Sequence, residues 1–117
     1  MLGLVVGWVL VGAVLTGALL YFWNDIRDWL NNTAANAVER VLGYNARKTM
    51  QRAVCKVDRV INNLKTKAIV YNKKSPLDTH YDRVILEATA PVYEIDNEVL
   101  QKIEEQGELV QEMRFKG

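Results

Sequence analysis

Basic side chains between residues 47 and 59 are the best candidates for chemistry in this sequence. Arg47, Lys48, Arg52, Lys56 and Arg59 lie there with a single acidic residue among them. Guanidinium and ammonium groups pair with phosphate oxygens, so the pattern is typical of a site for an anionic nucleotide or a short nucleic acid. Two other interpretations stay open. The basic residues can form a solvated surface that attracts anionic lipid headgroups, or they can pair with acidic residues of the same or a neighbouring chain.

Charge is unevenly distributed along the chain. The whole sequence has 15 basic and 14 acidic residues and a net charge of +1. Between Asp25 and Lys74 there are eleven basic and four acidic residues, whereas the rest of the chain has four basic and ten acidic residues. The sequence therefore predicts a dipolar molecule with one basic segment.

The other residue types that commonly do chemistry are isolated. His80 and Cys55 each stand alone, so we predict no metal site and no cofactor. Cys55 follows Val54 near apolar residues and is predicted to be a small buried hydrophobe rather than a reactive thiol. The paired acids Glu104 and Glu105 are expected to be solvated on an amphipathic helix. With neither a phosphate-binding glycine loop nor a nucleophile motif, the sequence predicts that the protein is not an enzyme.

A helix over residues 46–65 is the element expected to position the basic side chains. Apolar residues recur at the spacing of one helical face, and the basic residues occupy the other faces. The apolar stripe consists of Met50, Ala53, Val54, Val57, Val60, Ile61 and Leu64. We therefore expect a basic amphipathic helix that connects the N-terminal segment to the rest of the chain.

The N-terminal segment carries no charged residue from Leu2 to Trp23. As a helix, a segment of this length extends roughly 33 Å, enough to cross a hydrocarbon core of about 30 Å. A signal peptide is the alternative, but the basic start is missing and the small residues at 35–37 lie too far from the apolar run. Lysines and arginines follow the span and none precedes it, which predicts an inner-membrane protein with a cytoplasmic C-terminus.

Small residues give this predicted transmembrane helix a face on which copies of the chain can meet. Glycine lets helices in lipid approach closely, so we expect a homo-oligomer, although glycine is also common in membrane helices in general. The face consists of Gly3, Gly7, Leu10, Val14, Gly17 and Tyr21.

Residues 24–46 are predicted to continue as a polar helix with apolar residues at helical spacing. Asn31–Thr33 offers a possible stop with a new N-cap, and Gly43 offers a second break. Trp29 and Leu30 either hold this helix on the bilayer surface or extend the packing of the oligomer.

Beyond residue 66 the pattern changes to that of a small α+β unit. Ala68–Tyr71 is predicted to be a strand, and turn residues follow it. Val84–Leu86 and Pro91–Ile95 form either one long bent strand or two. Asp96 can then cap a helix that places Val99, Leu100 and Ile103 inward and ends at Gly107, while residues 109–115 form a final strand or continue that helix.

The predicted fold is thus a membrane α+β protein in three parts. A transmembrane helix occupies residues 1–23, juxtamembrane and basic amphipathic helices occupy 24–66, and a small cytoplasmic α+β domain occupies 67–117. This layout resembles the small single-pass membrane effectors of bacterial anti-phage signalling systems. These include nucleotide-gated types and the Hailong pair, whose channel is held by a DNA oligomer.

The resemblance implies a role in antiviral defence, with an anionic nucleotide or oligonucleotide as regulator bound by the basic residues at 47–59. We therefore expect a homo-oligomeric channel or membrane-perturbing effector regulated through its cytoplasmic domain. The alternative is a membrane-tethered adaptor or inhibitor, of the phage lysis or exclusion type, that binds a protein partner through its α+β domain.

Overall fold

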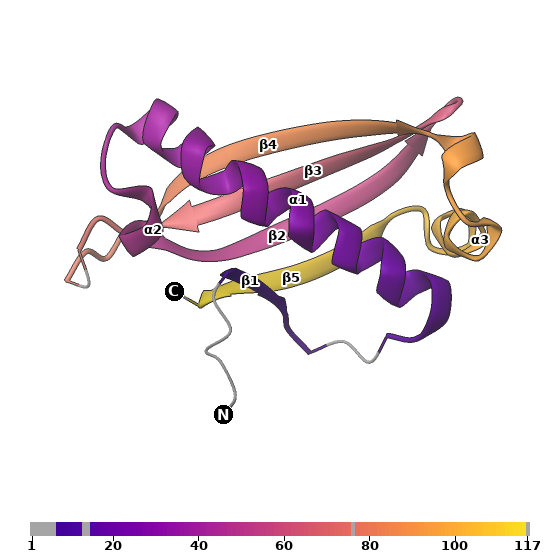
Figure 1. Cartoon of the computed structure of the whole chain (residues 1–117), viewed down its shortest axis with the longest axis horizontal. Coiled ribbons are helices and arrows are strands. Elements are labelled where there is room, and N and C mark those ends of the chain that lie inside the picture. Colours follow the sequence, from indigo (N-terminus) through magenta and orange to yellow (C-terminus); the bar gives the residue numbers. More distant parts are fainter. Residues whose placement is uncertain (1–6, 13–14, 76, 117) are drawn as a thin grey trace.

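The computed structural model describes residues 7–12, 15–75 and 77–116, and it folds them into one sheet and a helical layer (Figure 1). Five antiparallel strands are arranged in the order β1-β5-β2-β3-β4, and the long helix α1 lies across one face of the sheet. The elements are β1 (Gly7–Leu10), α1 (Gly17–Leu42), α2 (Ala46–Thr49), β2 (Met50–Val60), β3 (Asn63–Asn72), β4 (Asp82–Pro91), the 3-10 helix η1 (Val92–Glu94), α3 (Asn97–Gln106) and β5 (Leu109–Lys116).

The core lies between α1 and the sheet. Buried residues of α1 recur every three or four positions, which directs a single stripe toward the strands; they are Trp23, Ile26, Leu30, Ala34 and Val38. The strands alternate buried and exposed residues, because successive side chains point to opposite faces of a sheet. In β3 the buried set is Leu64, Thr66, Ala68, Val70 and Asn72. One face of the sheet is therefore apolar and covered by α1.

Several predicted elements are confirmed. Residues 24–42 are helical, and the helix ends at Gly43, which has a left-handed φ of 72°. The Asp96 side chain accepts a hydrogen bond from the Glu98 amide at 2.8 Å and so caps α3, and Gly107 follows the end of that helix. Residues 109–116 form a strand rather than a helix.

Two local predictions are wrong. The helix α1 runs through Asn31–Thr33 without a break. Residues 92–94 form the 3-10 helix η1 instead of a strand, so that the chain turns from the end of β4 toward α3.

The predicted basic amphipathic helix at 46–65 is also wrong. The segment contains only the short helix α2, followed by β2 and the start of β3. The residues between 53 and 57 satisfy a helical period and a strand period equally well, and β-branched valines favour the strand. Pairing with β3 on one side and β5 on the other decides the outcome, because β2 becomes the central strand of the sheet.

The predicted transmembrane helix at 2–23 is contradicted as well. The structure forms β1 at residues 7–10 and begins α1 at Gly17, whose positive φ of 58° does not belong to a right-handed helix. None of the helices in the described ranges is long and apolar enough to span a membrane. The apolar side chains serve the core instead, with Trp8 and Trp23 only 2% and 3% exposed. Residues 2–6, 13 and 14 lie outside the described part.

The chain forms a single sheet across the predicted domain boundary. Residues 66 and 67 are neighbours inside β3, and β5 pairs with β2 from the segment before that boundary. The predicted fold class, with its separate small α+β domain, is therefore replaced by one α+β unit. The predicted channel or effector function and the inner-membrane location stay predictions.

Candidate anion-binding surface

The face of the sheet opposite α1 carries the outward side chains of the strands, and we call it the open face. In the register, Arg52 lies opposite Tyr71 on β3 and opposite Arg114 on β5. Directly paired residues share a face, so these three side chains lie together. No described helix covers them, because α1 and α3 pack against each other on the other side. The open face is available to a partner.

Positive charge prevails on the open face. Its acids are Asp58, Glu87, Glu108 and Glu112, and its bases are Arg52, Lys56, Lys65, Lys67, Arg83, Arg114 and Lys116. Two cross-strand pairs are even of like charge, Arg52 with Arg114 and Lys56 with Lys67. Like charges directly opposite each other destabilise a sheet, so this arrangement favours an anion that bridges them.

Aromatic rings and cations alternate at one end of this face, in a group that we call the cation–ring cluster: Arg52, Tyr71, Tyr81 and Lys73. The Arg52 guanidinium carbon lies 4.4 Å from the centre of the Tyr71 ring. The Tyr71 and Tyr81 rings stand edge to face with 6.2 Å between their centres, and the Lys73 ammonium lies 4.8 Å from the centre of the Tyr81 ring. Tyr81 is 45% exposed, so its ring remains accessible to a ligand.

Neighbouring contacts hold the cluster in place. The Lys73 amide donates a hydrogen bond to the Thr49 carbonyl at 2.8 Å, which ties the end of β3 to α2. The Arg52 guanidinium lies 3.6 Å from the Glu112 carboxylate, an exposed pair worth at most about 1 kcal/mol. This single carboxylate leaves most of the hydrogen-bonding capacity of Arg52 for a ligand, since a guanidinium has five N–H donors.

Tyr44, in the loop before α2, contacts the residues that follow Lys73 and Tyr81 in the sequence. Its hydroxyl donates a hydrogen bond to the Asp82 carboxylate at 2.7 Å, and the Lys74 ammonium lies 5.8 Å from its ring centre. Partial burial, followed by the hydrogen bond and the negative charge of Asp82, raises the pKa of Tyr44 to about 12. Tyr44 is therefore a neutral hydrogen-bonding group at physiological pH.

The middle of the open face is less suited to an anion. A shallow depression of about 300 Å³ is lined by three lysines and three acids, so its charges offset each other; they are Lys56, Lys65, Lys67, Asp58, Glu87 and Glu108. The cation–ring cluster is the part of the open face where bases and rings come together.

The structure divides the predicted ligand residues among three places. Arg52 and Lys56 lie on the open face, and Arg47 and Lys48 are exposed on α2. Arg59 is paired with buried Leu64 and belongs to the opposite face, where its Nε donates to the Ile61 carbonyl at 3.0 Å. The prediction assumed a helix, and in a strand residues 52, 56 and 59 do not share one face.

The predicted oligomerisation residues do not form one helical face in the described ranges. Gly7 and Leu10 belong to β1, whereas Gly17 and Tyr21 lie in the first turns of α1. Gly3 and Val14 lie outside the described residues. The Tyr21 side chain is 72% exposed.

Sequence reasoning missed Tyr71, Tyr81, Arg83 and Arg114. For Tyr71 the available signal was the alternation of Lys65, Lys67, Ile69 and Tyr71, which puts these four side chains on one face once the segment is a strand.

The single cysteine and histidine take no part in the open face. Cys55 is fully buried, as predicted, and desolvation raises the pKa of its thiol to about 12. His80 is exposed in the turn before β4, as predicted.

No protein-family model, curated protein or solved structure matches this chain. The resemblance to anti-phage membrane effectors therefore stays a prediction, and the function has to be argued from the site itself.

Proposed function

We propose that this protein is a binding module for single-stranded nucleic acid, which it holds on the open face with the cation–ring cluster as anchor. The observation that carries the proposal is the alternation of Arg52, Tyr71, Tyr81 and Lys73 at one end of the open face. Exposed rings stack on nucleobases, and neighbouring cations pair with the phosphates that connect them.

The spacing along β2 suits a nucleic-acid backbone. Arg52 and Lys56 are four residues apart on one strand, which corresponds to about 13 Å at the rise of a β-strand. A single-stranded nucleic acid that lies along β2 can therefore contact Arg52 and then Lys56 with successive parts of its backbone. A folded double helix presents its bases inward, so the exposed rings favour an unpaired strand. The proposal keeps the anionic oligonucleotide that the sequence predicts and moves its site from a helix to the sheet.

The proposal is tested by measuring the binding of a fluorescein-labelled 12-nucleotide oligothymidylate by fluorescence anisotropy over a salt series. Tyr71→Leu removes a stacking ring and is expected to weaken binding roughly 5- to 100-fold, since one stacked base contributes about 1–3 kcal/mol. Arg52→Gln is expected to weaken binding and to reduce the slope of log K against log salt by about 0.7. Arg59→Gln removes the same charge from the other face and is the matched control.

Heparin, an anionic polymer without bases, separates stacking from charge. Arg52→Gln is expected to weaken the binding of both polymers, whereas Tyr71→Leu is expected to weaken only the binding of oligothymidylate. The proposal fails if the unmodified protein does not bind the oligonucleotide, or if Arg59→Gln costs as much affinity as Arg52→Gln.

A further inference from the structure

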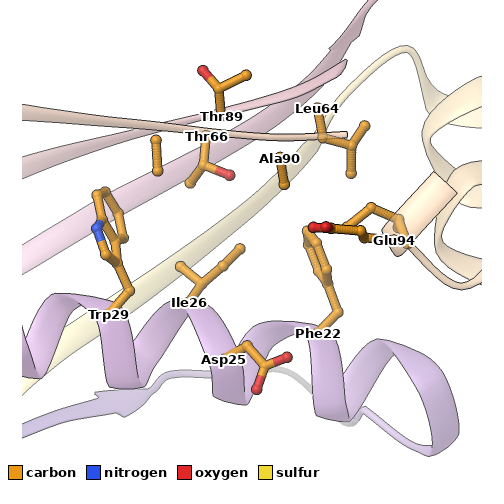
Figure 2. Close-up of a pocket in the computed structure, with 11 residues that line it drawn as sticks. Phe22, Asp25, Ile26, Trp29, Leu64, Thr66, Thr89, Ala90 and Glu94 are labelled. Carbon is orange, nitrogen blue, oxygen red and sulfur yellow. The ribbon is translucent and has the colours of Figure 1, made fainter. Parts of the chain in front are cut away.

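A second surface lies at the corner of the sheet where α1 and β4 diverge. The structure contains there an open wedge of about 300 Å³. Phe22, Ile26 and Trp29 of α1 form one wall, and Leu64, Ala88 and Ala90 of the sheet form the other (Figure 2). The wedge belongs to the helix-covered side of the sheet and is separate from the open face.

Small side chains leave the wedge unfilled. Because α1 crosses the sheet at an angle, its N-terminal half moves away from β4 (Figure 1). The inward residues of β4 at this end are Ala88 and Ala90, whose short side chains line the open space together with Phe22 and Trp29. The apolar walls therefore remain partly accessible, and Trp29 is only half-buried.

A free sheet edge runs beside the wedge. In the described part of the chain, β4 pairs only with β3 and is the last strand of the sheet. Alternate residues of an edge strand direct their N–H and C=O groups away from the sheet, where they can pair with another strand. The residues beside the wedge, at positions 88–90, precede Pro91, so they still have the N–H groups that such pairing needs.

Negative charge lies at the mouth of the wedge. Asp25 of α1 and Glu94 of η1 line it (Figure 2), and no basic residue of the described ranges does. Both acidic residues are exposed. Neither belongs to an ion pair within residues 7–12, 15–75 and 77–116, where the acids in such pairs are Asp28, Glu105 and Glu112. Positive charge on a ligand would complement them.

We infer that the wedge and the β4 edge together bind an extended peptide segment of another protein. The segment adds to β4 as a sixth strand, places an apolar side chain between Trp29 and Ala90, and places a lysine or arginine two residues away near Asp25 and Glu94. Strand addition supplies backbone hydrogen bonds, and the pocket beside the edge supplies selectivity for alternate side chains. Inward side chains of a strand are about 7 Å apart, which matches one apolar and one basic residue on the same face.

Selection from a phage-displayed library of random 12-residue peptides on the full chain tests this inference. We expect enrichment of alternating sequences with an apolar residue two positions from a lysine or arginine. Enrichment of acidic sequences, or no enrichment at all, would overturn the inference.

Variants then locate the binding site of a selected peptide. Ala90→Leu fills the wedge and is expected to lower the affinity for the peptide at least tenfold. If this variant does not fold, Ala88→Val fills part of the wedge with a smaller added volume and is expected to lower the affinity as well. The double variant Asp25→Asn/Glu94→Gln is expected to weaken binding severalfold at low salt. Glu87 lies on the open face of the same strand, so Glu87→Gln is the control and is expected to leave the affinity for the peptide unchanged. Equal affinity for the wedge-filling variants and the unmodified protein would overturn the inference.

A second copy of this chain is the competing occupant, and light scattering distinguishes it. We expect a selected peptide to bind without a change in oligomeric state. If the protein forms a dimer that the peptide dissociates and that Ala90→Leu abolishes, a second copy covers β4 and the inference is overturned.

Discussion

Ile61 adopts a backbone conformation that costs a β-branched residue free energy. It forms, with Asn62, the two-residue turn between β2 and β3, and its φ is 56°. The side chain is 80% exposed and so gains little from packing. A strained residue of this kind persists only because the long hairpin on either side holds the turn in place.

Ile61→Gly should therefore stabilise the protein. Glycine removes a left-handed penalty of about 1–2 kcal/mol, and its greater freedom in the unfolded chain offsets about half of it. We expect urea denaturation to show a gain of roughly 0.5–1 kcal/mol at an unchanged m-value. Ile61→Ala keeps the Cβ atom and should show none of this gain. A gain of equal size in Ile61→Ala would show that the exposed side chain, and not the backbone, is unfavourable.

Burial of Cys55 links stability to alkaline pH. Desolvation raises the pKa of its thiol from 9.0 to about 12, so the folded protein keeps a proton that the unfolded chain releases. The stability that comes from this difference is complete below pH 9 and is lost as the pH rises from about 9 to about 12.

We expect Cys55→Ala to be less stable than the unmodified protein at pH 8 but to lose less stability between pH 8 and pH 11. Free energies of unfolding from urea curves at a series of pH values, compared between the two proteins, measure the difference. Parallel pH profiles for the two proteins would contradict this explanation.

The short strand β1 depends on a close approach between Gly7 and α1. The Trp8 amide donates a hydrogen bond to the Asn31 side-chain oxygen at 2.7 Å, and Gly7 has a φ of 114°. A Cβ atom at Gly7 would lie 2.5 Å from the same Asn31 oxygen. The glycine thus lets the sheet edge and the helix meet, which is a different role from the predicted contact between helices in lipid.

Gly7→Ala should loosen β1 from the rest of the sheet. Steric overlap and the unfavourable φ act together, so we expect a loss of about 1–3 kcal/mol and reduced hydrogen-exchange protection of the Trp8 amide. Asn31→Ala removes the obstacle, and the double variant with Gly7→Ala should show only the cost of the φ angle and the lost hydrogen bond. If the two single changes are strictly additive, the steric contact is not responsible.

Sheet order makes the chain one cooperative unit. The N-terminal strand β1 lies beside the C-terminal strand β5, and β5 lies beside β2. The segment 67–117 on its own would lack both strands that pair with β5, namely β1 and β2, and the helix that covers the core. Such a short segment buries too little apolar surface to compensate for the entropy of ordering it.

We therefore expect a fragment of residues 67–117 to be unfolded, with no cooperative thermal transition by circular dichroism and little dispersion of amide resonances. The full chain should unfold in one transition. A folded fragment would restore the separate C-terminal domain that the sequence predicts.

The sequence alone determined the helices and strands whose caps and apolar periodicity lie within a few residues of each other. A helix with its apolar residues on one side begins after Asp96 and ends before Gly107, and the alternation at 109–115 belongs to a strand. Residues 24–42 have a helical period and form a helix that ends at Gly43. The burial of Cys55 and the exposure of His80 also follow from their immediate neighbours.

Only the tertiary structure decided which elements the apolar N-terminal segment and the basic segment form and where they pack. A long uncharged segment is typical of a membrane helix. Here, however, the apolar face of a sheet built mostly from residues 50–116 has to be buried, and Trp8 and Trp23 bury part of it. The segment at 46–65 satisfies both periods until β3 and β5 pair with β2 on either side. The same pairing places Arg52 beside Tyr71, and contacts between residues so distant in the sequence leave no local pattern from which they could be predicted.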